Sequence, residues 1–243
     1  MNRLSRVLLV LAFVLFTTSV YAEMVQEGSG EYLGGKKMNT DTAIDQMLNE
    51  HQIHNLLIRW GHARDSEDWS TLAECFHDDA TIHLSWISGS ANDFIAASQA
   101  MSKNRKPGTH MKHVISGPWI RVHKRRAFSR CHSHILIRLK LDGYEFDIQS
   151  WLQFYDLLEI RNESWRIAKR TAVYEKDRLD FVNPIENFEG LLADMDLSAF
   201  PESVKFLCYM IQKSGGAPST DIVTVYSEEE QLLKEEGEKW LVY

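Results

Sequence analysis

The stretch AFSRCHSHILIRLKLDGYEFDIQSWLQFYDLLEI, residues 127–160, decides the fold of this chain. It contains two long β-rich runs, over residues 127–141 and 144–160. Asp142-Gly143 separates the two runs and is a strong signal for a two-residue hairpin turn. The pattern therefore predicts two long antiparallel strands joined by a tight turn.

The residues on either side extend this pattern into a sheet. Two further β-rich runs, separated from the hairpin by turn residues, cover residues 110–122 and 165–176. Upstream, apolar residues at helical spacing predict three helices, over residues 41–63, 68–76 and 92–103. Between them we expect a turn at His77-Asp78-Asp79 and a strand over 80–86. Helices followed by a meander of long strands predict an α+β fold, with a curved antiparallel sheet packed on N-terminal helices.

The N-terminus has the pattern of a secretory signal peptide, which we assign to residues 1–22. Arg3 and Arg6 precede an apolar run over Val7–Phe16, and Val20-Tyr21-Ala22 fits a cleavage site. The apolar run is too short for a stable membrane insertion. We therefore expect an exported protein, periplasmic or secreted, with a flexible leader over residues 23–42.

The C-terminal part, residues 184–243, predicts a helical extension of the main domain at 43–183. Two helices are expected there, over Glu202–Lys213 and Tyr226–Leu241. They are too small to form a separate core, so we expect them to pack on the main domain or on a second subunit.

The charge balance argues against nucleic acid as a partner. The chain has 27 Lys and Arg against 34 Asp and Glu, a formal net charge of −7, and no long basic stripe. Its one short basic run, His123-Lys124-Arg125-Arg126, is interpreted as a solvated hairpin tip. The three cysteines are widely spaced, so one disulfide with a free thiol and three buried thiols both remain open.

Two short segments carry candidate chemistry. Asp65 follows the long N-terminal helix, and His113 lies near the start of a predicted strand. A carboxylate behind a histidine is a minimal general-base device, because the acid fixes the imidazole tautomer and stabilises the imidazolium that forms. If the two side chains meet in a pocket, the chain is expected to be an enzyme.

The order of elements over residues 43–183 resembles the NTF2-like (SnoaL-like) cone fold. Four local motifs also resemble that superfamily, in the expected order: Ile53-x-x-Leu56-Leu57 with Arg64-Asp65-x-x-Asp68-Trp69, Cys75-Phe76-His77-Asp78-Asp79-Ala80, His113-Val-Ile-Ser-Gly, and Trp165-Arg166-Ile167-x-Lys169-Arg170. The resemblance implies a cone with a mostly apolar pocket and association into a homodimer or homotrimer.

Two enzyme families of this superfamily, scytalone dehydratase and hexachlorocyclohexane dehydrochlorinase, place an Asp–His pair at these motifs. The resemblance assigns the aspartate to Asp65, the histidine base to His113 and an active-site arginine to Arg170. It implies proton abstraction followed by elimination or a double-bond shift, without a metal or organic cofactor. Arg64 and Leu84 stand where the dehydratase has tyrosines, so neither family's substrate is carried over. We expect a small hydrophobic substrate or ligand.

Aromatic residues are expected to line the pocket. We assign substrate-binding roles to five of them: Trp86, Trp119, Trp151, Phe154 and Tyr155.

Two alternatives remain open. The same pocket could bind a small molecule without turnover. A metal-binding protein could instead use a histidine cluster made of His110, His113, His132 and His134. A metal site of that type normally adds a glutamate a few residues later, where this chain has Arg138, Leu139 and Lys140. Our interpretation therefore includes no metal ligand.

Overall fold

The computed structural model describes residues 40–141, 143–184 and 195–242. The predicted signal peptide and most of the leader lie outside the described residues, so export stays a prediction. The chain divides into two units, Met1–Asp45 and Gln46–Tyr243. Only the start of one helix is described in the first unit, and every contact discussed below lies within the second.

The helices follow the predicted pattern closely. Their bounds are α2 Thr40–Ser66, α3 Trp69–Glu74, α4 Ala91–Lys103, the 3₁₀ helix η1 Glu202–Val204, α6 Lys205–Lys213 and α7 Glu228–Val242. Side-chain oxygens of Asp68 and Ser90 accept hydrogen bonds from backbone N–H groups at the starts of α3 and α4. In the described ranges, no helix is long and apolar enough to cross a membrane.

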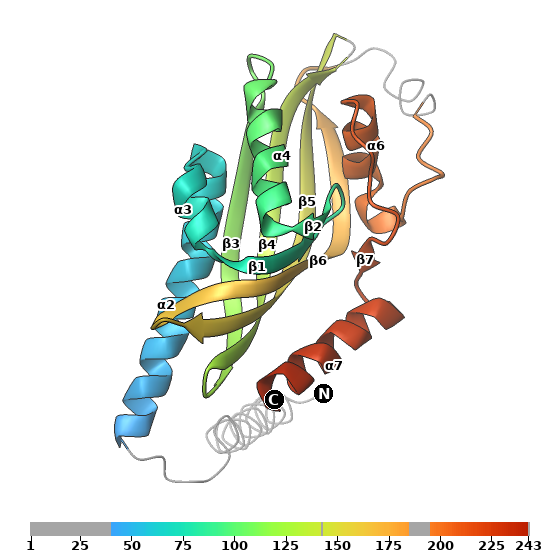
Figure 1. Cartoon of the computed structure of the whole chain (residues 1–243). Coiled ribbons are helices and arrows are strands. Elements are labelled where there is room, and N and C mark those ends of the chain that lie inside the picture. The colour runs from blue at the N-terminus through green and yellow to red at the C-terminus, as the bar shows by residue number, and fades with distance from the viewer. Residues whose placement is uncertain (1–39, 142, 185–194, 243) are drawn as a thin grey trace, which may run out of the picture. The chain divides into compact units, whose positions relative to one another are not determined.

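Among the described residues, seven strands form one sheet in the order β2-β1-β6-β5-β4-β3, with β7 also paired to β6. Their bounds are β1 Phe76–His83, β2 Ser88–Ser90, β3 His110–His123, β4 Arg126–Leu141, β5 Tyr144–Arg161, β6 Ser164–Phe181 and β7 Val223–Thr224. Strands β3 to β6 form the predicted antiparallel meander, and the β4–β5 register runs without a break to Leu141 and Tyr144. The predicted α+β fold with a curved antiparallel sheet is confirmed (Figure 1).

Strand β1 corrects one local prediction. His77-Asp78-Asp79, expected as a turn, lies inside β1, which pairs parallel to β6 with an irregularity between Phe76 and Thr81. The acidic residues suggested a turn, but an irregular strand accommodates them because Asp78 and Asp79 stay exposed.

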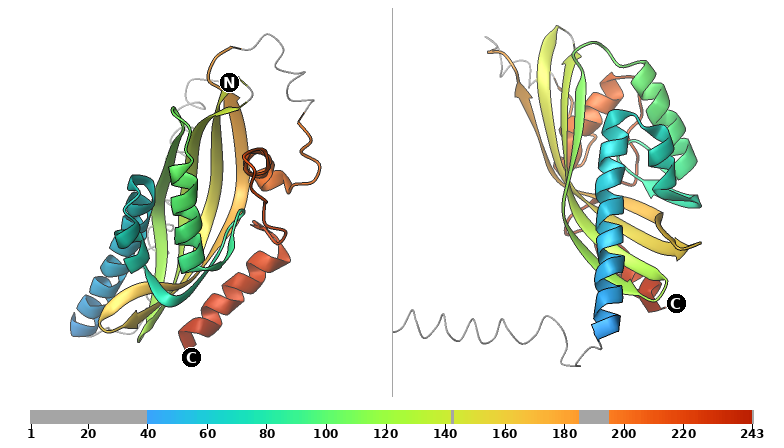
Figure 2. Two further views of the ribbon diagram at one scale, coloured as in Figure 1. Left: turned by 45° about the horizontal axis from the view of Figure 1, so that its top comes forward. Right: turned by 90° about the vertical axis from the view of Figure 1, so that its left-hand side faces the viewer.

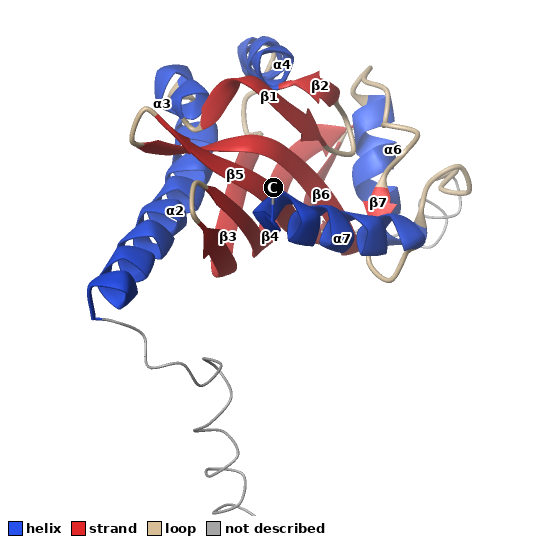
Figure 3. Ribbon diagram, turned by 60° about the horizontal axis from the view of Figure 1, so that its bottom comes forward, coloured by secondary structure: helices blue, strands red, loops and turns tan. Residues whose placement is uncertain are grey.

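The sheet has two differently covered faces. Helices α2, α3 and α4 lie on the inner face (Figure 2), where the larger apolar core also includes Leu207, Cys208 and Met210 of α6. Helix α7 lies on the outer face (Figure 3), where Leu241, Leu233 and Trp240 pack with a second, smaller apolar cluster. Cys75, Cys131 and Cys208 are free thiols, and all three are buried.

Candidate functional site

The structure brings Asp65 and His113 into direct contact. Asp65 lies in the last turn of α2 and His113 near the start of β3. Oδ1 of Asp65 is 2.7 Å from Nδ1 of His113, and Oδ2 accepts the backbone N–H of His113 at 2.8 Å. Both oxygens of the carboxylate therefore hold the same residue. The helix end and the strand are fixed relative to each other at this point.

This contact determines which imidazole nitrogen is available. Because the Asp65 carboxylate accepts a hydrogen bond at Nδ1, the neutral ring carries its proton there and has its lone pair on Nε2. No described residue hydrogen-bonds Nε2, and the side chain of His113 is 8% exposed. Burial lowers the pKa of His113 below its ordinary value of 6.5, although Asp65 opposes this shift. The ring is therefore neutral at pH 7 and can accept a proton.

Trp60 lies on the inner face and contacts His113, Phe154 and Arg170. Its ring meets His113 edge-on, with ring centroids 5.5 Å apart, and meets Phe154 in the same way at 5.1 Å. The guanidinium of Arg170 lies 4.3 Å from the Trp60 ring centroid and 4.2 Å from that of Phe154. Sequence reasoning placed Trp60 only in a buried helix stripe and missed its contact with His113.

Arg170 is fully buried, and its main partner is a residue that sequence reasoning also missed. Nε and Nη2 of Arg170 donate to the two carboxylate oxygens of Asp156 at 2.7 and 2.8 Å. Both side chains are 0% exposed. Nη1 of Arg170 and Nε1 of Trp60 are buried without a hydrogen-bond partner among the described residues. A polar residue within the apolar run of β5 was the available signal for Asp156.

The predicted pocket wall divides between the two faces. Phe154 lies on the inner face against Trp60, and Trp86 packs against Phe94, with ring centroids 5.7 Å apart. Trp151 stacks instead on His134, whose cross-strand neighbour is Val114, on the face opposite His113.

Trp119 and Tyr155 also lie on the outer face, where both contact the ring of Phe128. The placement of Trp119, Trp151 and Tyr155 in a pocket with His113 is therefore corrected. Neighbouring residues such as Phe154 and Tyr155 point to opposite faces of a strand, and a bulge between Ser116 and Trp119 reverses the facing of Trp119 relative to His113.

The register of β3 against β4 does not support the alternative of a metal site made of histidines. His132 and His134 pair with Ser116 and Val114 on the outer face, whereas His113 faces inward. Within the part of the chain that the structure describes, no three His, Cys, Asp or Glu side chains gather into a potential metal site.

Two clefts lie away from the Asp65–His113 pair. They have volumes of about 530 and 380 Å³, and the residues that line them belong mainly to β1, β6 and α7. Arg170 contributes to the smaller cleft, but neither cleft is lined by Asp65 or His113. In this conformation the inner face near His113 is packed with side chains, chiefly Trp60, Phe94 and Phe154.

The structure is thus an α+β fold in which helices cover a curved sheet, and the fold holds a buried Asp–His pair. The family model for the SnoaL-like domain matches residues 45–171, slightly more than half of the chain, and the protein belongs to this family.

Curated relatives extend over most of the chain. Pea pathogenicity protein 2 of Fusarium vanettenii is 32% identical, with 70% of this chain and 72% of the relative covered. A PEP2-like protein of the same fungus is 26% identical, with 80% and 86% covered.

Solved structures show a similar arrangement at low identity. LinA is 16% identical, with a TM-score of 0.49 over 60% of this chain and 95% of that protein. A putative scytalone dehydratase from Novosphingobium aromaticivorans is 14% identical, with a TM-score of 0.47 over 58% and 95%. At this identity and TM-score, neither likeness bears on the reaction.

Proposed function

We propose that this protein is a cofactor-independent lyase or isomerase that removes a proton from carbon in a small hydrophobic molecule. One observation carries the proposal. Both carboxylate oxygens of Asp65 hold His113, which leaves Nε2 of a buried, neutral imidazole as the proton acceptor.

Each polar group has a defined role in this reaction. Nε2 of His113 takes the proton from a carbon next to an electron-withdrawing or leaving group. Asp65 keeps the ring oriented and stabilises the imidazolium, and the developing negative charge needs a hydrogen-bond donor nearby. We assign that donor to Nη1 of Arg170, since Asp156 already occupies Nε and Nη2. Arg170 then offers the two N–H donors of Nη1 rather than an unpaired charge.

The surroundings favour a mostly apolar substrate. Trp60, Phe94 and Phe154 form the aromatic surface beside His113 and Arg170. Such a surface binds a small hydrophobic body and excludes water, which strengthens hydrogen bonds to the reacting atoms. Substrate entry requires these packed side chains to move.

The test begins with mass spectrometry of small molecules that co-purify with the protein. Each candidate is then incubated with the protein in D₂O, where reversible proton removal adds deuterium to carbon. We expect exchange or product formation with the wild-type protein and a loss of about 100-fold or more in His113→Gln, the usual scale for a general base.

His110→Gln is the matched control. His110 lies on the same strand, but it is exposed and belongs to the outer face. It should behave like the wild type. Tight binding of a co-purified molecule with neither exchange nor turnover would instead identify a non-catalytic binding protein.

A further inference from the structure

The larger cleft lies on the outer face, on the opposite side of the sheet from Asp65 and His113. Its volume is about 530 Å³, and its lining residues are Asp79, Arg126, Leu157, Arg161, Ala168, Lys169, Glu236, Lys239 and Trp240. Strands β5 and β6 contribute Leu157, Ala168 and Lys169, and α7 contributes the last three residues. The cleft is therefore a feature of how α7 lies on the sheet and is separate from the candidate catalytic site.

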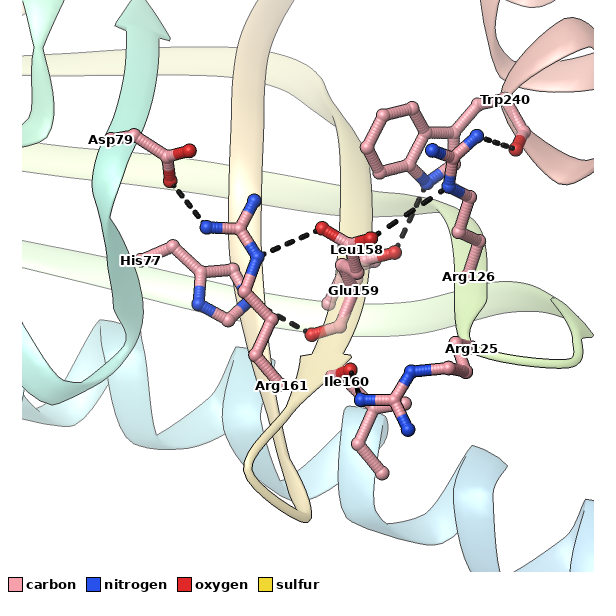
Figure 4. Close-up of polar contacts among 9 residues, drawn as sticks. All are labelled: His77, Asp79, Arg125, Arg126, Leu158, Glu159, Ile160, Arg161 and Trp240. Carbon is pink, nitrogen blue, oxygen red and sulfur yellow. Dashed lines mark hydrogen bonds and ion pairs between the residues drawn. The ribbon is translucent and has the colours of Figure 1, made fainter. Parts of the chain in front are cut away.

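Two guanidinium groups are held on either side of one carboxylate in this cleft (Figure 4). Nε of Arg161 donates to Glu159 at 2.9 Å, and Nη1 donates to Asp79 at 2.7 Å. Nε of Arg126 lies 3.8 Å from the other oxygen of Glu159, and its Nη1 donates to the backbone oxygen of Trp240 at 3.4 Å. No described residue hydrogen-bonds Nη2 of either arginine, so each keeps a donor available.

An apolar surface lies beside these donors. The indole of Trp240 is fixed by a hydrogen bond from Nε1 to the backbone oxygen of Leu158 at 3.0 Å. The guanidinium of Arg126 stacks 4.3 Å from its ring centroid. Together with Leu157 and Ala168, this ring gives the cleft a wall that can contact a hydrocarbon or aromatic body.

The cationic side chains of the cleft are paired with neighbouring acids. The lining has four cations, Arg126, Arg161, Lys169 and Lys239, and the acids paired with them are Asp79, Glu159, Glu235 and Glu236. These formal charges balance, so what the cleft offers an anion is the Nη2 donors of Arg126 and Arg161. The Arg161–Asp79 pair is solvent-accessible, with side chains 40% and 67% exposed, so Arg161 can exchange this partner at small cost.

We propose that this cleft binds a small amphipathic monocarboxylate. Its carboxylate is bridged by Nη2 of Arg126 and Nη2 of Arg161, and its apolar part lies against Leu157, Ala168 and Trp240. A guanidinium matches the planar geometry of a carboxylate, and such charge-assisted hydrogen bonds are about twice as strong as neutral ones. This site is independent of the proposed lyase or isomerase activity.

Isothermal titration calorimetry with three probes of equal chain length tests the proposal: octanoate, octan-1-ol and octylammonium. We expect saturable 1:1 binding of octanoate and binding of the other two that is about tenfold weaker or more. Arg161→Gln and Lys239→Gln should each weaken octanoate binding, with the larger effect, about tenfold, for Arg161. Lys239 is 72% exposed, so its variant does not depend on an altered fold.

Arg138→Gln is the matched control, because Arg138 is an exposed arginine paired with Asp147 outside the cleft. It should leave octanoate binding unchanged. Three results would overturn the assignment: no saturable binding of octanoate, octan-1-ol binding as tightly as octanoate, or binding that survives Arg161→Gln and is lost in His113→Gln.

Discussion

Two Arg–Asp pairs on opposite faces of the sheet have almost the same geometry and very different surroundings. On the inner face, Arg170 binds Asp156 through two hydrogen bonds of 2.7 and 2.8 Å, and both side chains are 0% exposed. On the outer face, Arg138 binds Asp147 at 2.7 and 2.6 Å, but the side chains are 44% and 35% exposed.

The two ion pairs therefore differ in burial and not in hydrogen-bond geometry. Water can solvate Arg138 and Asp147 if they part, so their pairing adds little to stability. Arg170 and Asp156 have no such alternative, and each would leave an uncompensated charge in the core if the other were removed. The same difference makes the inner face suitable for chemistry, since hydrogen bonds and charges act more strongly away from water.

The largest expected effect comes from breaking the inner pair. Asp156→Asn leaves the charge of Arg170 buried with a neutral partner, and we expect a loss of about 3–5 kcal/mol in the free energy of unfolding. Asp147→Asn, the matched change on the outer face, should leave that free energy almost unchanged. Urea denaturation of both variants measures the difference. Equal losses in the two variants would contradict the role assigned to burial.

The two faces should also differ in how the free energy of unfolding depends on pH, and this effect is smaller. Asp177 lies at the first turn of α6, where its Oδ2 accepts the backbone N–H of Leu207 at 2.9 Å. Burial raises its pKa from 3.8 to about 6, against the effect of the Leu207 and Phe206 amides and of Lys205, while Glu202 adds to the rise. The folded protein therefore keeps this proton to a higher pH than the unfolded chain. Stability contributed by the protonated carboxyl is lost as the pH rises from about 4 to about 6.

Asp177→Asn should remove this loss, because the amide stays neutral and its oxygen can still accept the Leu207 N–H. Relative to wild type, we expect the variant to gain about 1 kcal/mol between pH 4 and pH 7, after discounting for partial exposure. Asp147→Asn should show the opposite sign. Its carboxylate has a lowered pKa because of Arg138, so the wild type loses that stabilisation as the pH falls. Parallel pH profiles for the two variants would refute the distinction.

The long strands were predictable from the sequence because their signals are local. Two β-rich runs on either side of the Asp142-Gly143 turn predict the β4–β5 hairpin without reference to the rest of the chain. The pairing of β1 with β6, by contrast, joins segments about 90 residues apart, and no local pattern specifies it.

The candidate site was predictable only in part for the same reason. Asp65 and His113 were found from motifs, but the faces of Trp119, Trp151 and Tyr155 depend on strand register. The bulge at Gly117-Pro118 reverses the facing of Trp119, and Gly117 adopts a φ of 55° there, a conformation that glycine accommodates easily. Asp156 could not be paired with Arg170 before the register of β5 and β6 was known.

The central claim is that Asp65 holds His113 as a neutral imidazole with its lone pair on Nε2. Nitrogen-15 NMR of the histidine side chains, followed as a function of pH, tests it without a substrate. We expect His113 to carry its proton on Nδ1 and to titrate below pH 6.5, because burial lowers its pKa. Asp65→Asn should lower that pKa further, because the raising effect of the carboxylate is lost. A proton on Nε2, or a pKa above 6.5 in the wild-type protein, would contradict the account.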